Sequence, residues 1–280
     1  MRNFLLLFIT LALPLPAQDD YLARAKKLAT QYIGIDTHID TMQRALFGAD
    51  LSKRSQQLFD AHPEMIEQAT SAADIERIVA AGKIAGVLTI EGGHQIDNEL
   101  PVLRQYRRMA IMAMTLTHFK NNDWADSSTD NAAHNGLTDF GKQVVREMNR
   151  IGMIVDVSHV SDKIFFDTLA ITTKPVILSH SSCRVISEVP RNVTEEFKRD
   201  MAPTKVSATI ADAVAHIDHA VKIAGIDHVG IGSDFDGISG PPKGLEDQSL
   251  KFSAISAMLC LLYGIKHSSV HPQPCQQNLH

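Results

Sequence analysis

Short apolar runs alternate with helix-like stretches along most of this sequence, and this alternation is the feature that most constrains the fold. Six runs are typical of strands buried on both faces, at residues 34–38, 85–90, 110–116, 153–157, 175–179 and 228–233. Amphipathic stretches predict helices around them, at residues 20–32, 71–81, 99–108, 137–149, 162–169 and 208–224. Strands that alternate with helices predict an α/β domain built on a parallel sheet.

The composition fits a globular chain and excludes several classes of protein. Of the 280 residues, 44% are hydrophobic and 21% are charged, which is enough apolar material for a large core. The formal net charge of -5 gives no basic footprint for nucleic acid, so we expect no nucleic-acid partner. The three cysteines are too few and too scattered for a disulfide scaffold or a zinc finger.

The N-terminus has the layout of a secretory signal peptide. Arg2 supplies a positive charge, residues 4–13 are apolar, and the small residue Ala17 precedes a polar stretch. We therefore expect a signal peptide over residues 1–18, a single domain over residues 19–280, and export to the periplasm or the extracellular space. The apolar run is short for a membrane-spanning helix. The alternative is that the N-terminus is not cleaved and anchors the protein to the membrane.

Potential metal ligands and acid or base groups follow the expected strands at their carboxyl ends. In barrel folds the carboxyl ends of the strands carry the chemistry, so we expect these side chains to converge. In chain order they are His38, Asp40, Glu91, His118, His159, His180 and Asp234. Serines beside two of the histidines are candidates for hydrogen bonds that orient the rings, at positions 158, 161, 181 and 182.

The residue types in this set suit metal-assisted hydrolysis. His38 and Asp40 alternate along one strand, so both side chains reach the same face and can bind one ion. The carboxylate of Glu91 can bridge two cations, and the glycine pair after it lets the backbone turn sharply and approach closely. Imidazoles combined with carboxylates suit zinc. Asp234 can take a proton from water and pass it to a leaving amine.

Each motif taken alone has an alternative interpretation. The HxD pair also fits a surface loop, Glu91 fits a helix N-terminus, and Asp234 fits an acidic turn. A serine–histidine nucleophile is the rival interpretation of His159 and His180, but the sequence holds no G-x-S-x-G elbow.

Seven segments together resemble the membrane dipeptidase (renal dipeptidase) family of zinc metallopeptidases. They follow the family's order and cover most of the chain from about residue 33 to residue 247: IDTHIDT, TIEGGHQID, MTLTHFKNNDWADS, DVSHVSD, ILSHSS, PRNVTEE and IDHVGIGSDFDG. The resemblance implies a TIM-like (β/α) barrel of the metal-dependent hydrolase type, two zinc ions and a dipeptide substrate. It also implies tolerance of a D-residue at the second position and, in some members, the opening of β-lactams.

The resemblance assigns a role to each site residue. His38 and Asp40 match the ligands of the first zinc ion, His159 and His180 match those of the second, and Glu91 matches the ligand that bridges them. A hydroxide held between the two ions attacks the peptide carbonyl in this family.

Three further residues match groups that act on the water or the substrate. Asp234 corresponds to the acid that orients the water and shuttles its proton, and His118 to the histidine that polarises the carbonyl and stabilises the oxyanion. Arg191 corresponds to the arginine that grips the C-terminal carboxylate of the substrate. That grip explains a preference for dipeptides, because the carboxylate must lie one peptide bond from the metals.

The sequence departs from the family's pattern in three places. We find no good strand between Asp40 and Ala85, and relative to the family a strand-bearing segment is absent near residues 54–57. A second such segment is absent near residues 203–206. The tail from about residue 250 does not continue as the family's closing helices. We therefore expect an incomplete barrel. Two alternatives to an active dipeptidase stay open, a non-catalytic or unstable remnant and another barrel amidohydrolase, and a homodimer is compatible with the sequence.

Overall fold

The computed structural model describes residues 59–60, 62–193, 210–225, 228–230, 232 and 234, all of which belong to one compact unit, Ile35–Gly244. Several predictions therefore concern residues outside the described part. These are the signal peptide, the expected helix at 20–32, the expected strand at 34–38, the departures near 54–57 and 203–206, and the tail from residue 250.

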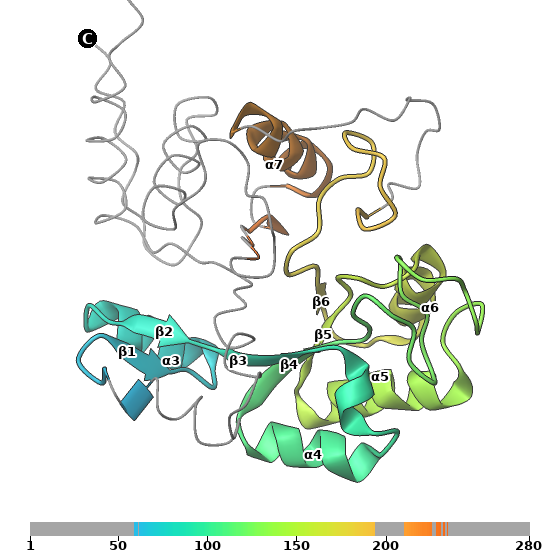
Figure 1. Ribbon diagram of the computed structural model, residues 1–280. Coiled ribbons are helices and arrows are strands. Elements are labelled where there is room, and N and C mark those ends of the chain that lie inside the picture. Colours follow the sequence, from blue (N-terminus) through green and yellow to red (C-terminus); the bar gives the residue numbers. More distant parts are fainter. Residues whose placement is uncertain are drawn as a thin grey trace, which may run out of the picture. The chain divides into compact units, whose positions relative to one another are not determined.

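A four-stranded parallel sheet is the larger of the two sheets in the described part of the chain (Figure 1). Its strands lie side by side in chain order: β3 (Leu88–Glu91), β4 (Ile111–Thr115), β5 (Ile154–Asp156) and β6 (Val176–Ile177). The last residues of the strands are in register, because Glu91 pairs with Thr115, Thr115 with Asp156, and Asp156 with Ile177. Side chains that follow these strands therefore start from one common edge of the sheet.

The described helices match the predicted ranges to within two residues at each end. They are α3 (Ala72–Ala80), α4 (Leu100–Arg108), α5 (Asp139–Ile151), α6 (Asp162–Ile171) and α7 (Ile210–Ala224). The hydroxyls of Ser71, Thr138 and Ser161 cap α3, α5 and α6 by accepting a backbone N–H from the first turn. None of the helices in the described part is long and apolar enough to cross a bilayer.

The hydrophobic core lies between this sheet and the helices that connect its strands. Helix α5 packs against α4, α6 and β5, and α4 packs against β4. The fully buried side chains include Leu103, Met114, Val144, Met148 and Ile164. Burial of each such side chain contributes about 1.5–3 kcal/mol, so the core fixes the strands and hence the positions of their carboxyl ends.

The prediction of no strand between Asp40 and Ala85 is wrong. Strand β1 (Ile66–Gln68) lies in this interval and pairs in parallel with β2 (Ile84–Gly86), which forms a separate two-stranded sheet. The strand expected at 85–90 is accordingly two strands, β2 and β3. No apolar run marks β1 because its three residues are only partly buried and two of them are polar.

The strand expected at 228–233 also differs from the structure. Residues 228–230 and 232, which are described, are not in a strand. The backbone N–H of His228 instead donates to the carbonyl oxygen of Gly225 at 3.1 Å.

Candidate metal centre

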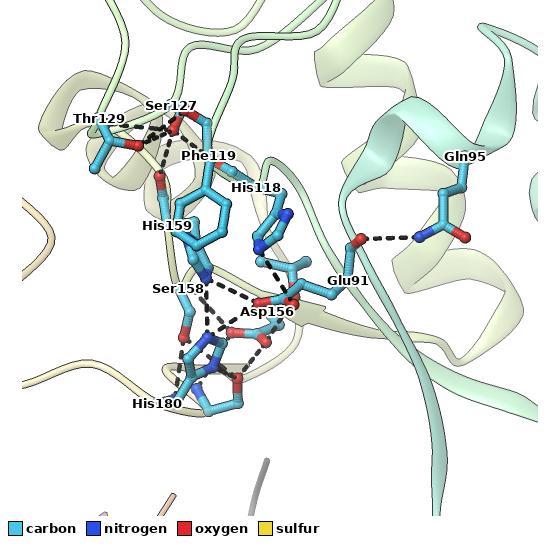
Figure 2. A network of polar contacts seen from close by, with 12 residues as sticks. Glu91, Gln95, His118, Phe119, Ser127, Thr129, Asp156, Ser158, His159 and His180 are labelled. Carbon is cyan, nitrogen blue, oxygen red and sulfur yellow. Dashed lines mark hydrogen bonds and ion pairs between the residues drawn. The ribbon is translucent and has the colours of Figure 1, made fainter. Parts of the chain in front are cut away.

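Four of the predicted site residues meet at the carboxyl edge of the four-stranded sheet (Figure 2). Glu91 is the last residue of β3, and His118, His159 and His180 each come three residues after the end of β4, β5 and β6. The same offset from aligned strand ends brings the three imidazoles to the carboxylate. The convergence predicted from the sequence is confirmed for these four residues.

The atoms of Glu91, His159 and His180 that could bind a metal form a tight triangle. Glu91 Oε1 lies 2.8 Å from His159 Nε2 and 3.0 Å from His180 Nε2, and the two ring nitrogens are 2.9 Å apart. The second carboxylate oxygen, Oε2, is 3.4 Å from His118 Nε2. Donor atoms of Glu91, His118 and His159 all lie within 4.8 Å of one another. Nitrogen and oxygen donors gathered in this way fit zinc, whose ligand bonds are about 2.0–2.2 Å long.

The surroundings of His159 favour a neutral ring. The residue is 3% exposed, and burial lowers the pKa of its imidazole by more than the hydrogen bond to Glu91 raises it. Its Nδ1 is buried and has no hydrogen-bond partner within the described part of the chain. A neutral imidazole keeps the lone pair that a metal ion requires.

The loop between β4 and α5 fixes the backbone of two of the histidines. The Ser127 hydroxyl donates to the carbonyl oxygen of His118 at 2.5 Å, and the backbone N–H of Ser128 donates to the carbonyl oxygen of His159 at 2.8 Å. The ring of Phe119 lies edge-on to the ring of His159, with centroids 5.3 Å apart (Figure 2). The loop therefore ties the strand ends of β4 and β5 together beside the centre.

The two glycines after Glu91 allow the sharp turn and the close approach that were predicted from the sequence. Gly92 has φ +100°, a backbone conformation that L side chains rarely adopt. A Cβ on Gly93 would lie 2.6 Å from the carbonyl oxygen of Leu116 and 2.3 Å from the ring of Trp124. The sharp turn and the close approach are both confirmed, and they place the chain after β3 directly against β4.

Arg191 lies within electrostatic reach of the centre and also of Asp234. Burial lowers the pKa of the Arg191 guanidinium, while the carboxylates of Asp234, Glu91 and Asp156 act in the opposite direction. The Nη1 atom of Arg191 is buried and has no hydrogen-bond partner among the described residues. A buried guanidinium nitrogen in this state is suited to an anionic ligand.

Two predicted ligands, His38 and Asp40, lie outside the described residues. The structure therefore describes the half of the predicted centre that Glu91, His159 and His180 form, together with His118. The residues of this half fit a zinc ion by donor type and by spacing.

A buried carboxylate that was not predicted from the sequence lies directly beside the ligands. Asp156 is 4% exposed, and its neighbour Ser179 has its hydroxyl oxygen 2.7 Å from Nδ1 of His180. The signal was an aspartate inside the apolar run MIVDV, because a buried aspartate needs several hydrogen-bond donors. Of the serines predicted to support the rings, Ser158 accepts the backbone N–H of His180 at 3.2 Å, whereas Ser161 caps α6.

Comparison with known proteins agrees with the resemblance noted in the sequence. The family model described as membrane dipeptidase (peptidase family M19) matches residues 8–262. Dipeptidase tcpJ of Claviceps purpurea is 39% identical over 221 residues, which are 73% of this chain and 52% of that protein. An uncharacterised dipeptidase of Schizosaccharomyces pombe is 39% identical over 238 residues, which are 78% of this chain and 57% of that protein. The chain spans about half the length of these curated relatives.

A solved structure shows the same fold at low sequence identity. It is a metallo peptidase from Rhodobacter sphaeroides liganded with a phosphinate mimic of the dipeptide L-Ala-D-Ala, with a TM-score of 0.68 and 22% identity. The match covers 76% of this chain and 67% of that chain. The fold is accordingly the α/β, TIM-like barrel type that was predicted. Since the family model spans nearly all of the sequence, and aligned strand ends bring together residues of the segments that carried the resemblance, this chain belongs to the membrane dipeptidase family, peptidase family M19.

Proposed function

We propose that this chain is a dipeptidase that depends on two zinc ions. The observation that supports the proposal is the convergence of Glu91, His159 and His180 on one point at the carboxyl edge of the sheet. These three residues would hold one ion, and Glu91 would share the second ion with His38 and Asp40.

The chain's own residues would carry the proton transfers and stabilise the developing charge. Zinc, when bound, supplies the Lewis acid that makes water a nucleophile at neutral pH. Asp234 accepts the proton of the attacking water and delivers it to the leaving amine. His118, whose Nε2 faces the Glu91 carboxylate at 3.4 Å, donates a hydrogen bond to the carbonyl oxygen as negative charge develops there.

Arg191 would select dipeptides by binding the C-terminal carboxylate. Its buried Nη1 without a partner among the described residues supports this role, because a carboxylate can accept two parallel hydrogen bonds from a guanidinium. The related metallo peptidase was solved with a mimic of L-Ala-D-Ala. We extend the proposal to dipeptides with a D-residue at the second position.

Export of the protein is part of the same proposal. It is supported by the charged, apolar and small-residue order within residues 1–18. Processing is checked by N-terminal sequencing of the secreted protein, which we expect to begin close to residue 19.

The decisive experiment measures zinc content and dipeptide hydrolysis on the same preparation. We expect two zinc ions per chain and activity that is lost to a chelator and restored by zinc. Full metal loading without turnover on a dipeptide panel would contradict the proposed reaction. Substoichiometric zinc with broad, non-cooperative melting would instead support the non-catalytic remnant.

The variant Arg191→Ala separates a dipeptidase from another barrel amidohydrolase. We expect kcat/KM on dipeptides to fall about 100-fold, since a charge-assisted hydrogen-bond pair is lost, while the slow hydrolysis of C-terminally blocked amides stays unchanged. The exposed residue Arg108 offers a matched control, and Arg108→Ala should leave both rates unchanged. An equal loss on both substrate types would favour the amidohydrolase.

A further inference from the structure

We propose that Asp156 and Ser179 form a relay that holds the proton of His180 on Nδ1 and so keeps the lone pair of Nε2 available to a metal ion. The metal part of this inference rests on the proposed function. The position of the proton is a property of the metal-free chain and can be measured without zinc.

Asp156 accepts four hydrogen bonds. Its Oδ1 accepts the backbone N–H groups of Ser158 at 2.9 Å and Ser179 at 3.2 Å. Its Oδ2 accepts the hydroxyl of Thr115 at 2.9 Å and the hydroxyl of Ser179 at 2.5 Å. Backbone N–H groups can only donate, so Oδ1 is fixed as an acceptor, and four donors in all surround an acceptor-only carboxylate.

The Ser179 hydroxyl has a single proton to donate. We assign that proton to Asp156 Oδ2, which at 2.5 Å is a nearer acceptor than His180 Nδ1 at 2.7 Å and carries the negative charge. The contact of 2.7 Å between Ser179 Oγ and His180 Nδ1 must then use a lone pair of the oxygen. The ring nitrogen is therefore the donor, and His180 carries its proton on Nδ1.

The proton on Nδ1 decides which nitrogen of His180 can bind a metal ion at the candidate centre. With Nδ1 protonated, His180 Nε2 keeps its lone pair. It lies 3.0 Å from Glu91 Oε1 and 2.9 Å from His159 Nε2, a spacing that suits three donor atoms around one shared cation. Figure 2 shows the ring of His180 next to Asp156 at this edge of the sheet. The neighbouring ligand His159 has no comparable restraint, because its Nδ1 is without a hydrogen-bond partner in the described structure.

The relay makes a specific prediction for the variant Asp156→Asn. The two backbone N–H groups hold the amide oxygen at the place of Oδ1, so the NH2 group takes the place of Oδ2. The NH2 group then donates to Ser179, the Ser179 hydroxyl donates to His180 Nδ1, and the ring proton moves to Nε2. The variant Ser179→Ala removes the restraint without imposing the wrong tautomer.

The test combines zinc affinity with the tautomer of His180. By competition with a chelator, we expect zinc affinity to fall about 100-fold in Asp156→Asn and about 10-fold in Ser179→Ala, with recovery in Ser179→Thr. The matched control is Thr168→Val, which removes a fully buried hydroxyl that has no hydrogen-bond partner in the described part. This variant should keep the affinity of the wild type.

Long-range 15N–1H spectra of the metal-free full chain, labelled with 15N-histidine, report the tautomer directly. His180 is assigned by the signal lost in His180→Gln. We expect the proton on Nδ1 in the wild type and on Nε2 in Asp156→Asn; if Asp156→Asn does not fold, mixed tautomers in Ser179→Ala support the relay. A wild-type proton on Nε2, or wild-type zinc affinity in both variants, overturns it. If the wild type binds no zinc, the proposed function fails and the tautomer still decides the inference.

Discussion

Glu147 on α5 and Asp156 on β5 are both buried carboxylates, but their surroundings differ in charge. Glu147 is 8% exposed and accepts hydrogen bonds from Arg104 Nε at 2.5 Å and from Arg150 Nε and Nη2 at 2.7 and 2.6 Å. The hydrogen bonds from Arg150, and then the bond from Arg104, lower the pKa of Glu147 to about 2 against the opposing effect of burial. Asp156 accepts its hydrogen bonds from uncharged hydroxyls and backbone N–H groups.

Glu147 therefore stabilises the fold, whereas Asp156 and Glu91 belong to the candidate metal centre. Between α4 and α5 the chain supplies its own cations, so the negative charge is neutralised within the protein. At the carboxyl edge of the sheet, Asp156 receives neutral donors and Glu91 faces imidazoles, of which His159 has its pKa lowered by burial. This edge is therefore suited to cations from outside the chain.

The largest expected effect comes from removing the charge of Glu91. We expect Glu91→Gln to lower zinc affinity by more than about 100-fold, because a shared ligand and its charge are lost together. The melting temperature of the metal-free chain should stay equal or rise, since the edge then holds less unneutralised charge. Chelator competition and thermal melting measure the two effects. Glu67→Gln, on the separate two-stranded sheet, is the control that should keep zinc affinity.

Between α4 and α5 we expect a substitution to lower stability and to leave zinc affinity unchanged. Glu147→Gln should lower the free energy of unfolding by about 2 kcal/mol, because it leaves two guanidinium groups without their shared anion. Zinc affinity should be unchanged. Urea unfolding measures the stability, with the exposed Glu64→Gln as control. A loss of zinc affinity in Glu147→Gln would break the distinction between the two regions.

A smaller effect follows from pH. The pKa of Glu147 is about 2 in the folded chain against an ordinary value of 4.5, so its contribution is complete above 4.5 and disappears as the pH falls toward 2. The stability difference between the wild type and Glu147→Gln should therefore shrink from about 2 kcal/mol near neutrality to less than about 1 kcal/mol near pH 2. Urea unfolding of both proteins across this range provides the check, and a difference that does not change with pH would contradict the assignment.

Structure could be predicted from the sequence where a residue type has one common local role. Ser71 marked the start of α3 because its hydroxyl can cap a helix, and the acids and histidines at strand ends marked the centre because parallel strands share one edge. Strand β1 was missed because its polar residues conceal it. The relay through Ser179 was not predictable, because the direction of a hydrogen bond depends on ring orientation and strand register.

The order of the strands also determines when during synthesis the centre can form. Glu91 leaves the ribosome on the first strand of the four, whereas His180 follows the last one, and each strand pairs with the one made just before it. Pairing of β6 with β5 must therefore precede the meeting of Glu91, His159 and His180, so an ion that needs all three donors would bind late in folding.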